Sequence, residues 1–203
     1  MNFHPLYSSL VLAVLLVAPF ESCQERSVAP KPFKMARGPE DLVRAVAFSY
    51  ENRSLSAYRD LMTDDFTMVC AEADSAGNVF RGVAHTREDE LLRFAALTAP
   101  YREPPFRELT LEFGEPIVTT AGTRPGHRII RTTYLLQYAE GSEPTRSLTG
   151  EVQFFIVRGD SASLPPLGDQ PDDPRVWYLE RWEDLSTGNG WCAFPGGNPL
   201  PTP

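Results

Sequence analysis

Four polar side chains on two predicted strands form the clearest candidate for a binding site in this sequence. On the last predicted strand, WYLERWEDL, residue alternation would place Trp177, Arg181 and Glu183 on one face. On the strand before it, the same rule places Glu151 and Gln153 together. If the two faces coincide, these groups could bind a polar or anionic ligand. The alternative is a solvated sheet face with cross-strand ion pairs, which contribute under about 1 kcal/mol each.

The histidines and cysteines show no metal-ligating pattern. The chain has three of each, and neither His85 nor His127 has a second histidine or cysteine at ligand spacing. We therefore expect no metal site, and we expect no cofactor.

The composition is that of one globular domain with flanking segments. Of 203 residues, 42% are hydrophobic and 23% are charged, which excludes a disordered chain, a collagen-like chain and a multi-span membrane protein. The formal net charge of −8 leaves no basic field for a polyanion. Nucleic-acid binding is therefore not expected.

A short apolar run near the start of the chain, Leu10–Phe20, predicts export. It is too short for a membrane-spanning helix, which needs about 20 residues, but it fits the apolar core of a signal peptide, which needs about 7–15. No lysine or arginine precedes the run, so a non-cleaved anchor is the alternative. We expect residues 1–22 to be a signal peptide.

The residues after this run, Ser22 and Cys23, resemble the processing site of bacterial lipoproteins, where the cysteine becomes the lipidated first residue. The polar, proline-containing stretch that follows has the composition of a tether, and we expect the tether to span residues 23–38. The resemblance implies a protein of the bacterial cell envelope that touches the membrane only through a lipid on Cys23. A periplasmic or freely secreted protein is the alternative.

Hydrophobic spacing predicts three helices followed by a long antiparallel meander. The first helix is expected over 39–52, and Ser54 and Thr86 are suited to cap the next two. The strands are expected at 66–71, 79–83, 109–113, 128–138, 147–158 and 175–185. This order predicts an α+β fold, in which a curved antiparallel or mixed sheet wraps around the helices.

Three segments resemble the nuclear transport factor 2-like superfamily, which includes the ketosteroid isomerases and the polyketide-cyclase-like SnoaL group. They are SYENRSLSAYRDLMTDDFTMV (49–69), the helix start at Thr86, and WYLERWEDL (177–185). The resemblance covers residues 39–187 and implies a cystatin-like α+β cone, followed by a Gly/Pro-rich tail over 188–203. It indicates fold rather than activity, because this fold carries enzymes, binding modules and adaptors alike.

The resemblance argues against the isomerase reaction. The isomerases use a carboxylate base with a tyrosine and a protonated aspartate, and these positions correspond here to Cys70, Val46 and Gln153. In the SnoaL group, an acid on the last strand corresponds to Glu183, while Arg181 replaces a histidine. Because arginine stays protonated, a working acid–base pair is in question.

The resemblance also suggests a disulfide between Cys70 and Cys192. If Cys23 carries a lipid, these two cysteines remain, and exported proteins meet an oxidising compartment. In the resembling fold the first and last strands are parallel neighbours, which brings the end of the first close to the segment after the last. The bond would hold Trp191 across the mouth of the cone. The alternative is a buried free thiol at Cys70 and an exposed Cys192.

Two functions stay open. The first is an exported binding or interaction module of the cell envelope that binds a small hydrophobic or polar ligand, or a protein partner. The second is a SnoaL-like isomerase, cyclase or hydratase that acts on a small hydrophobic substrate with Glu183 as acid or base. A filled cone would favour the module, and a closed cone around a shielded Glu183 would favour the enzyme. A homodimer through the outer sheet face, common in the superfamily, also stays open.

Overall fold

The computed structural model describes residues that all lie in one unit of the chain, 32–203. The described residues are 36–73, 76–99, 106–122, 124–160, 173–187 and 191–193. The expected signal peptide and most of the expected tether lie outside them, and so does Cys23. Within the described ranges, no helix is both long and apolar enough to cross a bilayer.

Three helices form where the sequence predicts them. They are α1 (Pro39–Glu51), α2 (Leu55–Asp60) and α3 (Arg87–Thr98). The Ser54 hydroxyl accepts a hydrogen bond from the Ala57 amide at the start of α2. Thr86 and Asp89 form a reciprocal capping box at the start of α3. These caps satisfy amide groups that a helix start leaves without a partner, which fixes where each helix begins.

Seven strands form one mixed sheet in the described part of the chain. They are β1 (Met62–Ala73), β2 (Val79–Thr86), β3 (Phe106–Phe113), β4 (Ile117–Thr120), β5 (His127–Glu140), β6 (Arg146–Arg158) and β7 (Trp177–Asp184). Their order is β2-β1-β7-β6-β5-β3, with β4 paired to β5, and only β1 and β7 pair in parallel. The α+β prediction is confirmed, although β4 was not predicted.

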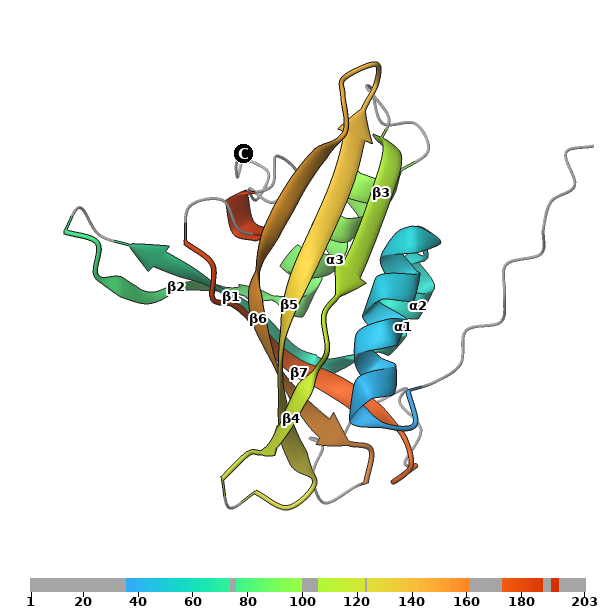
Figure 1. Ribbon diagram of the computed structural model, residues 1–203. Coiled ribbons are helices and arrows are strands. Elements are labelled where there is room, and N and C mark those ends of the chain that lie inside the picture. The colour runs from blue at the N-terminus through green and yellow to red at the C-terminus, as the bar shows by residue number, and fades with distance from the viewer. Residues whose placement is uncertain are drawn as a thin grey trace, which may run out of the picture. The chain divides into compact units, whose positions relative to one another are not determined.

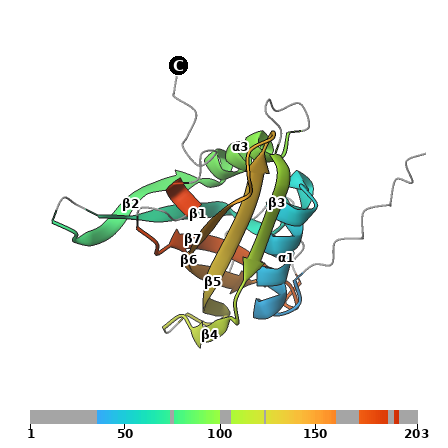
Figure 2. The same cartoon turned by 45° about the horizontal axis from the view of Figure 1, so that its top comes forward.

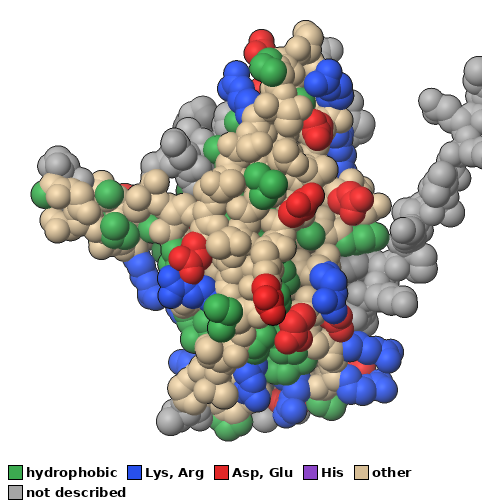
Figure 3. Space-filling model, viewed as in Figure 1, with side chains coloured by type: hydrophobic (Ala, Val, Ile, Leu, Met, Phe, Trp, Pro, Cys, Tyr) green, Lys and Arg blue, Asp and Glu red, His purple; other side chains and the backbone are tan. Residues whose placement is uncertain are grey.

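The sheet curves around α1 and α3, which lie on its inner face (Figures 1 and 2). Alternation along β5 shows the two faces: Ile130 and Tyr134 are buried in the core, while Arg131 and Thr133 are exposed on the outer face. The hairpin of β1 and β2 projects from the rest of the sheet and carries exposed apolar side chains (Figure 3). The most exposed of these is Val83.

A β-bulge in β7 changes which side chains face the interior. Phe155 of β6 pairs with Arg181, and the next residue of β6 pairs with Leu179, so Glu180 is an extra residue in the ladder. The prediction that Trp177 shares one face of the strand with Arg181 and Glu183 is therefore wrong. Leu179 and Trp182 both point inward and are buried, and Trp177 packs against the same core, whereas Arg181 and its neighbours on the outer face point away.

The core between the inner face and the helices includes two residues from segments expected to flank the domain. Ala36 is 1% exposed, and its carbonyl accepts a hydrogen bond from the Trp177 amide. The packed domain therefore already includes Ala36, which lies within the stretch expected to be a tether. Trp191 opens a short 3-10 helix, Trp191–Ala193, and is 0% exposed. It is therefore enclosed in the core and does not lie across the mouth of the cone as an outer lid.

Candidate functional site

The interior of the domain is filled by the indole ring of Trp191. Its ring centre lies 5.0 Å from that of Tyr50, 5.8 Å from Tyr134 and 5.0 Å from Trp182. The guanidinium of Arg93 lies over the same ring, 5.4 Å from its centre. These four partners come from α1, β5, β7 and α3, so one ring joins the sheet to two helices. We call this space, bounded by the four partners of Trp191, the inner chamber.

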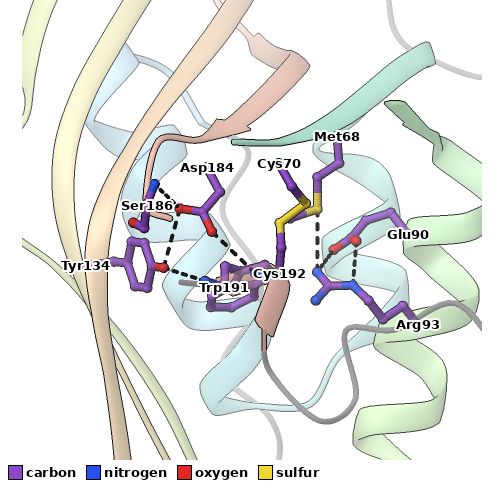
Figure 4. Close-up of a disulfide and its surroundings, with 9 residues drawn as sticks. All are labelled: Met68, Cys70, Glu90, Arg93, Tyr134, Asp184, Ser186, Trp191 and Cys192. Atoms are coloured by element: carbon purple, nitrogen blue, oxygen red, sulfur yellow. Dashed lines mark hydrogen bonds and ion pairs between the residues drawn. A yellow bond between two sulfur atoms is a disulfide. The ribbon is translucent and has the colours of Figure 1, made fainter. Parts of the chain in front are cut away.

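Two polar side chains of the inner chamber hold the backbone of the tail (Figure 4). The Trp191 amide donates to the Tyr134 hydroxyl at 2.5 Å, and the Cys192 amide donates to the Asp184 carboxylate at 3.3 Å. Asp184 also accepts from the Ser186 amide at 3.0 Å. Burial raises the pKa of Asp184 above its usual value, and burial beside the Asp184 charge raises the pKa of Tyr134 to about 12.

The predicted disulfide between Cys70 and Cys192 is formed, with Cα atoms 6.0 Å apart (Figure 4). It joins the end of β1 to the residue after Trp191. Both cysteines are half-buried beside a small hollow of about 30 Å³, which His85 and Asp89 also line. Since its sulfur is bonded, Cys70 cannot serve as a base.

A buried ion pair on α3 forms a second wall of the inner chamber. Arg93 donates two hydrogen bonds to Glu90, from Nε at 2.7 Å and from Nη2 at 2.6 Å. The Tyr58 hydroxyl donates to the same carboxylate at 2.8 Å. Burial, together with the Glu90 charge, raises the pKa of Tyr58 well above its usual value. The paired carboxylate and guanidinium explain how both charges can stay buried.

The predicted polar cluster lies on the outer face, without Trp177. Gln153 is opposite Glu183 in the register, and Glu151 forms an ion pair with Arg131. The Glu183 carboxylate is 6% exposed and lies 2.8 Å from Arg81 and 3.1 Å from Arg181. The structure thus brings Glu151, Gln153, Arg181 and Glu183 to one face, where Glu183 pairs with Arg181 within β7 and Glu151 pairs with Arg131 across strands. It does not place them in the interior.

An open groove of about 390 Å³ lies beside this cluster on the outer face, which we call the outer groove. Arg124, His127 and Arg128, at the turn between β4 and β5, line one side of it. Arg181 lies across the groove, with its guanidinium 3.7 Å from the centre of the Phe155 ring. The acids Asp65 and Glu180 also line it, and Glu180 lies 3.7 Å from His127. Arginine side chains gather at this end of the sheet, near β4 (Figure 3).

Sequence reasoning missed the polar residues of the inner chamber. Neither Tyr134 nor Glu90 was among the candidate residues taken from the sequence. Asp184 was not a candidate either, although its neighbour Glu183, which points to the outer face, was one. Strand alternation counted forward from Trp182 to Asp184 could have identified Asp184 as inward-facing. Among the described residues, no group of three acidic, histidine or cysteine side chains could hold a metal ion.

Comparisons with known proteins detect likeness in structure alone. No protein-family model and no curated protein sequence matches the chain. A structure of naphthalene 1,2-dioxygenase with indole bound aligns at a TM-score of 0.54 and 11% identity, covering 74% of this chain and 77% of that one. The β subunit of benzoate 1,2-dioxygenase from Burkholderia mallei ATCC 23344 aligns at 0.52 and 9% identity, over 71% and 85%.

A third structure is described as the β subunit of an aromatic-ring-hydroxylating dioxygenase from Novosphingobium aromaticivorans DSM 12444. It aligns at a TM-score of 0.51 and 13% identity, covering 73% of this chain and 86% of that one. At such identities the likeness concerns the fold and not the activity. The described domain therefore has the curved α+β fold of the nuclear transport factor 2-like proteins, which these β subunits share.

Proposed function

We propose that this protein is an exported binding module of the cell envelope whose ligand site is the outer groove. The observation that carries the proposal is that Trp191 fills the inner chamber, whereas the outer groove is open and lined by polar side chains. A filled interior favours a binding module over an enzyme that encloses its substrate there.

The lining of the outer groove suits a small molecule with a carboxylate or phosphate group. Arg124, Arg128 and Arg181 supply three guanidinium groups, whose planar forks match such anions in two-point hydrogen bonds. Asp65 and Glu180 add acceptors for a positive or hydroxyl group on the same ligand. The volume of about 390 Å³ lies within the usual range for small-molecule sites.

Native mass spectrometry of protein purified from the cell envelope tests this function. We expect a co-purifying anionic small molecule that is lost, or bound about tenfold more weakly, in Arg128→Ala and Arg181→Ala. Arg146→Ala is the matched control, because Arg146 is an exposed arginine that pairs with Glu143 instead of lining the groove. Equal loss of the ligand in the control and in the groove variants would rule the groove out.

Export and lipid attachment form a second part of the proposal. The short apolar run before Cys23 supports cleavage between Ser22 and Cys23. Intact-mass analysis of the mature protein should show a diacylglyceryl group on Cys23, and Cys23→Ser should release the protein from the membrane. A mature chain that starts elsewhere without lipid would exclude the lipoprotein but leave export in place.

The enzyme alternative with Glu183 as acid or base finds no support in the geometry. Glu183 lies between Arg81 and Arg181 on the outer face, and the acid that faces the interior, Asp184, binds the tail. We also expect no steroid isomerase activity, since Val46, Cys70 and Gln153 replace the required groups.

Two structural neighbours are β subunits by name, which supports a protein partner as an additional role.

A further inference from the structure

We propose that the Cys70–Cys192 disulfide is a redox latch on a second binding site, the inner chamber, which takes a flat aromatic ligand in place of Trp191 when the bond is reduced. This site goes beyond the outer groove and does not depend on it. Trp191 is then a built-in occupant that shows what the chamber can hold.

The contacts of Trp191 define the chemical class of the ligand. Tyr50 and Tyr134 meet the indole edge to face, Trp182 meets it at a tilt, and the Arg93 guanidinium covers its face. Edge-to-face rings and a cation over the ring face recognise flat aromatic systems in general. Because Glu90 pairs with Arg93, this wall carries no net charge, which favours an uncharged ring.

Two hydrogen-bonding groups become available when the tail leaves. The Tyr134 hydroxyl now accepts from the Trp191 amide, and the Asp184 carboxyl group accepts from the Cys192 amide. A ligand with a ring N–H or O–H donor could replace these amides. The chamber therefore offers both a flat apolar space and matching polar partners, as small-molecule sites usually do.

The disulfide is placed so that it controls the tail directly. Cys192 is the residue after Trp191, and both cysteines are half-buried beside a hollow that His85 and Asp89 line. A dithiol reductant would attack one sulfur as a thiolate, form a mixed disulfide, and then close on itself to release the second cysteine. The protein disulfide gains two electrons and two protons, which the dithiol loses as it becomes a disulfide.

After reduction, the Trp191 side chain can leave the inner chamber and return to it. After Asp184 the chain runs only a few residues to Trp191, so the freed ring would still compete at an effective concentration on the order of millimolar. A free aromatic ligand must therefore bind well or be abundant to displace it. The oxidised protein, in contrast, should exclude such ligands.

Titration of the full chain with indole, the ring of Trp191 itself, tests the latch. By ligand-observed NMR we expect the oxidised protein to bind indole about tenfold or more weakly than the protein treated with dithiothreitol, and than Cys192→Ser without reductant. Hydrogen exchange at the Trp191 amide should accelerate in the same two states. Trp191→Gly, with the disulfide intact, should bind indole without reductant. Cys23→Ser keeps the latch and should still require dithiothreitol.

Unchanged indole binding and unchanged Trp191 exchange after reduction and in Cys192→Ser would overturn the proposal. Binding by Trp191→Gly alone would overturn the latch. If Trp191→Gly does not fold, Cys192→Ser decides the question. Arg128→Ala should leave indole binding unchanged, so a failure of the outer groove can be told apart from a failure of the latch.

Discussion

The inner and outer faces of the sheet use the same strand, β7, for opposite purposes. On the inner face, Trp182 packs against Trp191 and Asp184 binds the tail, so this side of the strand is committed to the protein's own chain. On the outer face, Arg181 lines an open groove and Glu183 pairs with two arginines. A filled chamber and an available site can therefore be separated by one residue in the sequence.

The largest expected effect comes from emptying the inner face. Trp191→Ala should lower the free energy of unfolding by about 3–5 kcal/mol, because removal of a fully buried aromatic ring leaves a cavity. Urea denaturation without reductant measures it. Trp191→Phe keeps a ring in place and should lose clearly less. Equal stability of Trp191→Ala and the wild type would mean that the ring does not fill the chamber in solution.

The next effect tests the covalent link of the inner face. Cys192→Ser should cost about 2–4 kcal/mol, since the bond closes a loop between residues 122 positions apart. Reductant should destabilise the wild type by a similar amount and leave the variant unaffected. If dithiothreitol leaves the urea midpoint of the wild type unchanged, the disulfide does not stabilise the protein as expected.

A smaller effect is expected from Glu183, the outer-face carboxylate that pairs with Arg81 and Arg181. Glu183→Gln should lower the free energy of unfolding by about 1 kcal/mol. This is less than for a fully buried ion pair, because the side chains of Arg81 and Arg181 are 65% and 32% exposed and solvent screens them. Urea titration at low and high salt checks it, and a loss as large as that of Trp191→Ala would erase the contrast between the faces.

Asp184, on the inner face, should make the free energy of unfolding depend on pH. Because its pKa is raised in the folded state by burial, the folded protein holds this proton more tightly than the unfolded chain. The resulting stabilisation is present below the unfolded pKa of about 3.8 and is lost as the pH rises through the folded pKa. The stability of the wild type relative to Asp184→Asn should therefore fall across this window in paired urea titrations. A constant difference would show that Asp184 titrates as in the unfolded chain.

The smallest effect is expected at the exposed pair of Arg131 and Glu151. Both residues are in contact with solvent, which screens the pair, so Arg131→Ala should leave the urea midpoint unchanged within error. A double-mutant cycle with Glu151→Ala measures the coupling directly. Strong coupling would indicate that the outer face is shielded in solution, for example by a second copy of the chain.

Local signals explain which parts of the fold could be predicted. Ser54 and Thr86 cap their helices through neighbours three residues away, so their roles are visible in the sequence. The bulge at Glu180 depends on the register between β6 and β7, which alternation along one strand cannot reveal. The position of Trp191 depends on a contact between the tail and four distant elements. The disulfide was predicted only because a resembling fold supplied the missing topology.

The parallel pairing of β1 with β7 sets a condition on how the domain can fold. β7 lies between β1 and β6, so before it is added the sheet exists as two separate pieces, β2-β1 and β6-β5-β3. Met68 of β1 meets Trp182, more than a hundred residues later in the chain. Contacts of such long range slow folding, because a large loop must close before they form. We therefore expect sheet completion and closure of the disulfide to come late in folding, and a chain that stops before β7 to expose two unpaired sheet edges to aggregation.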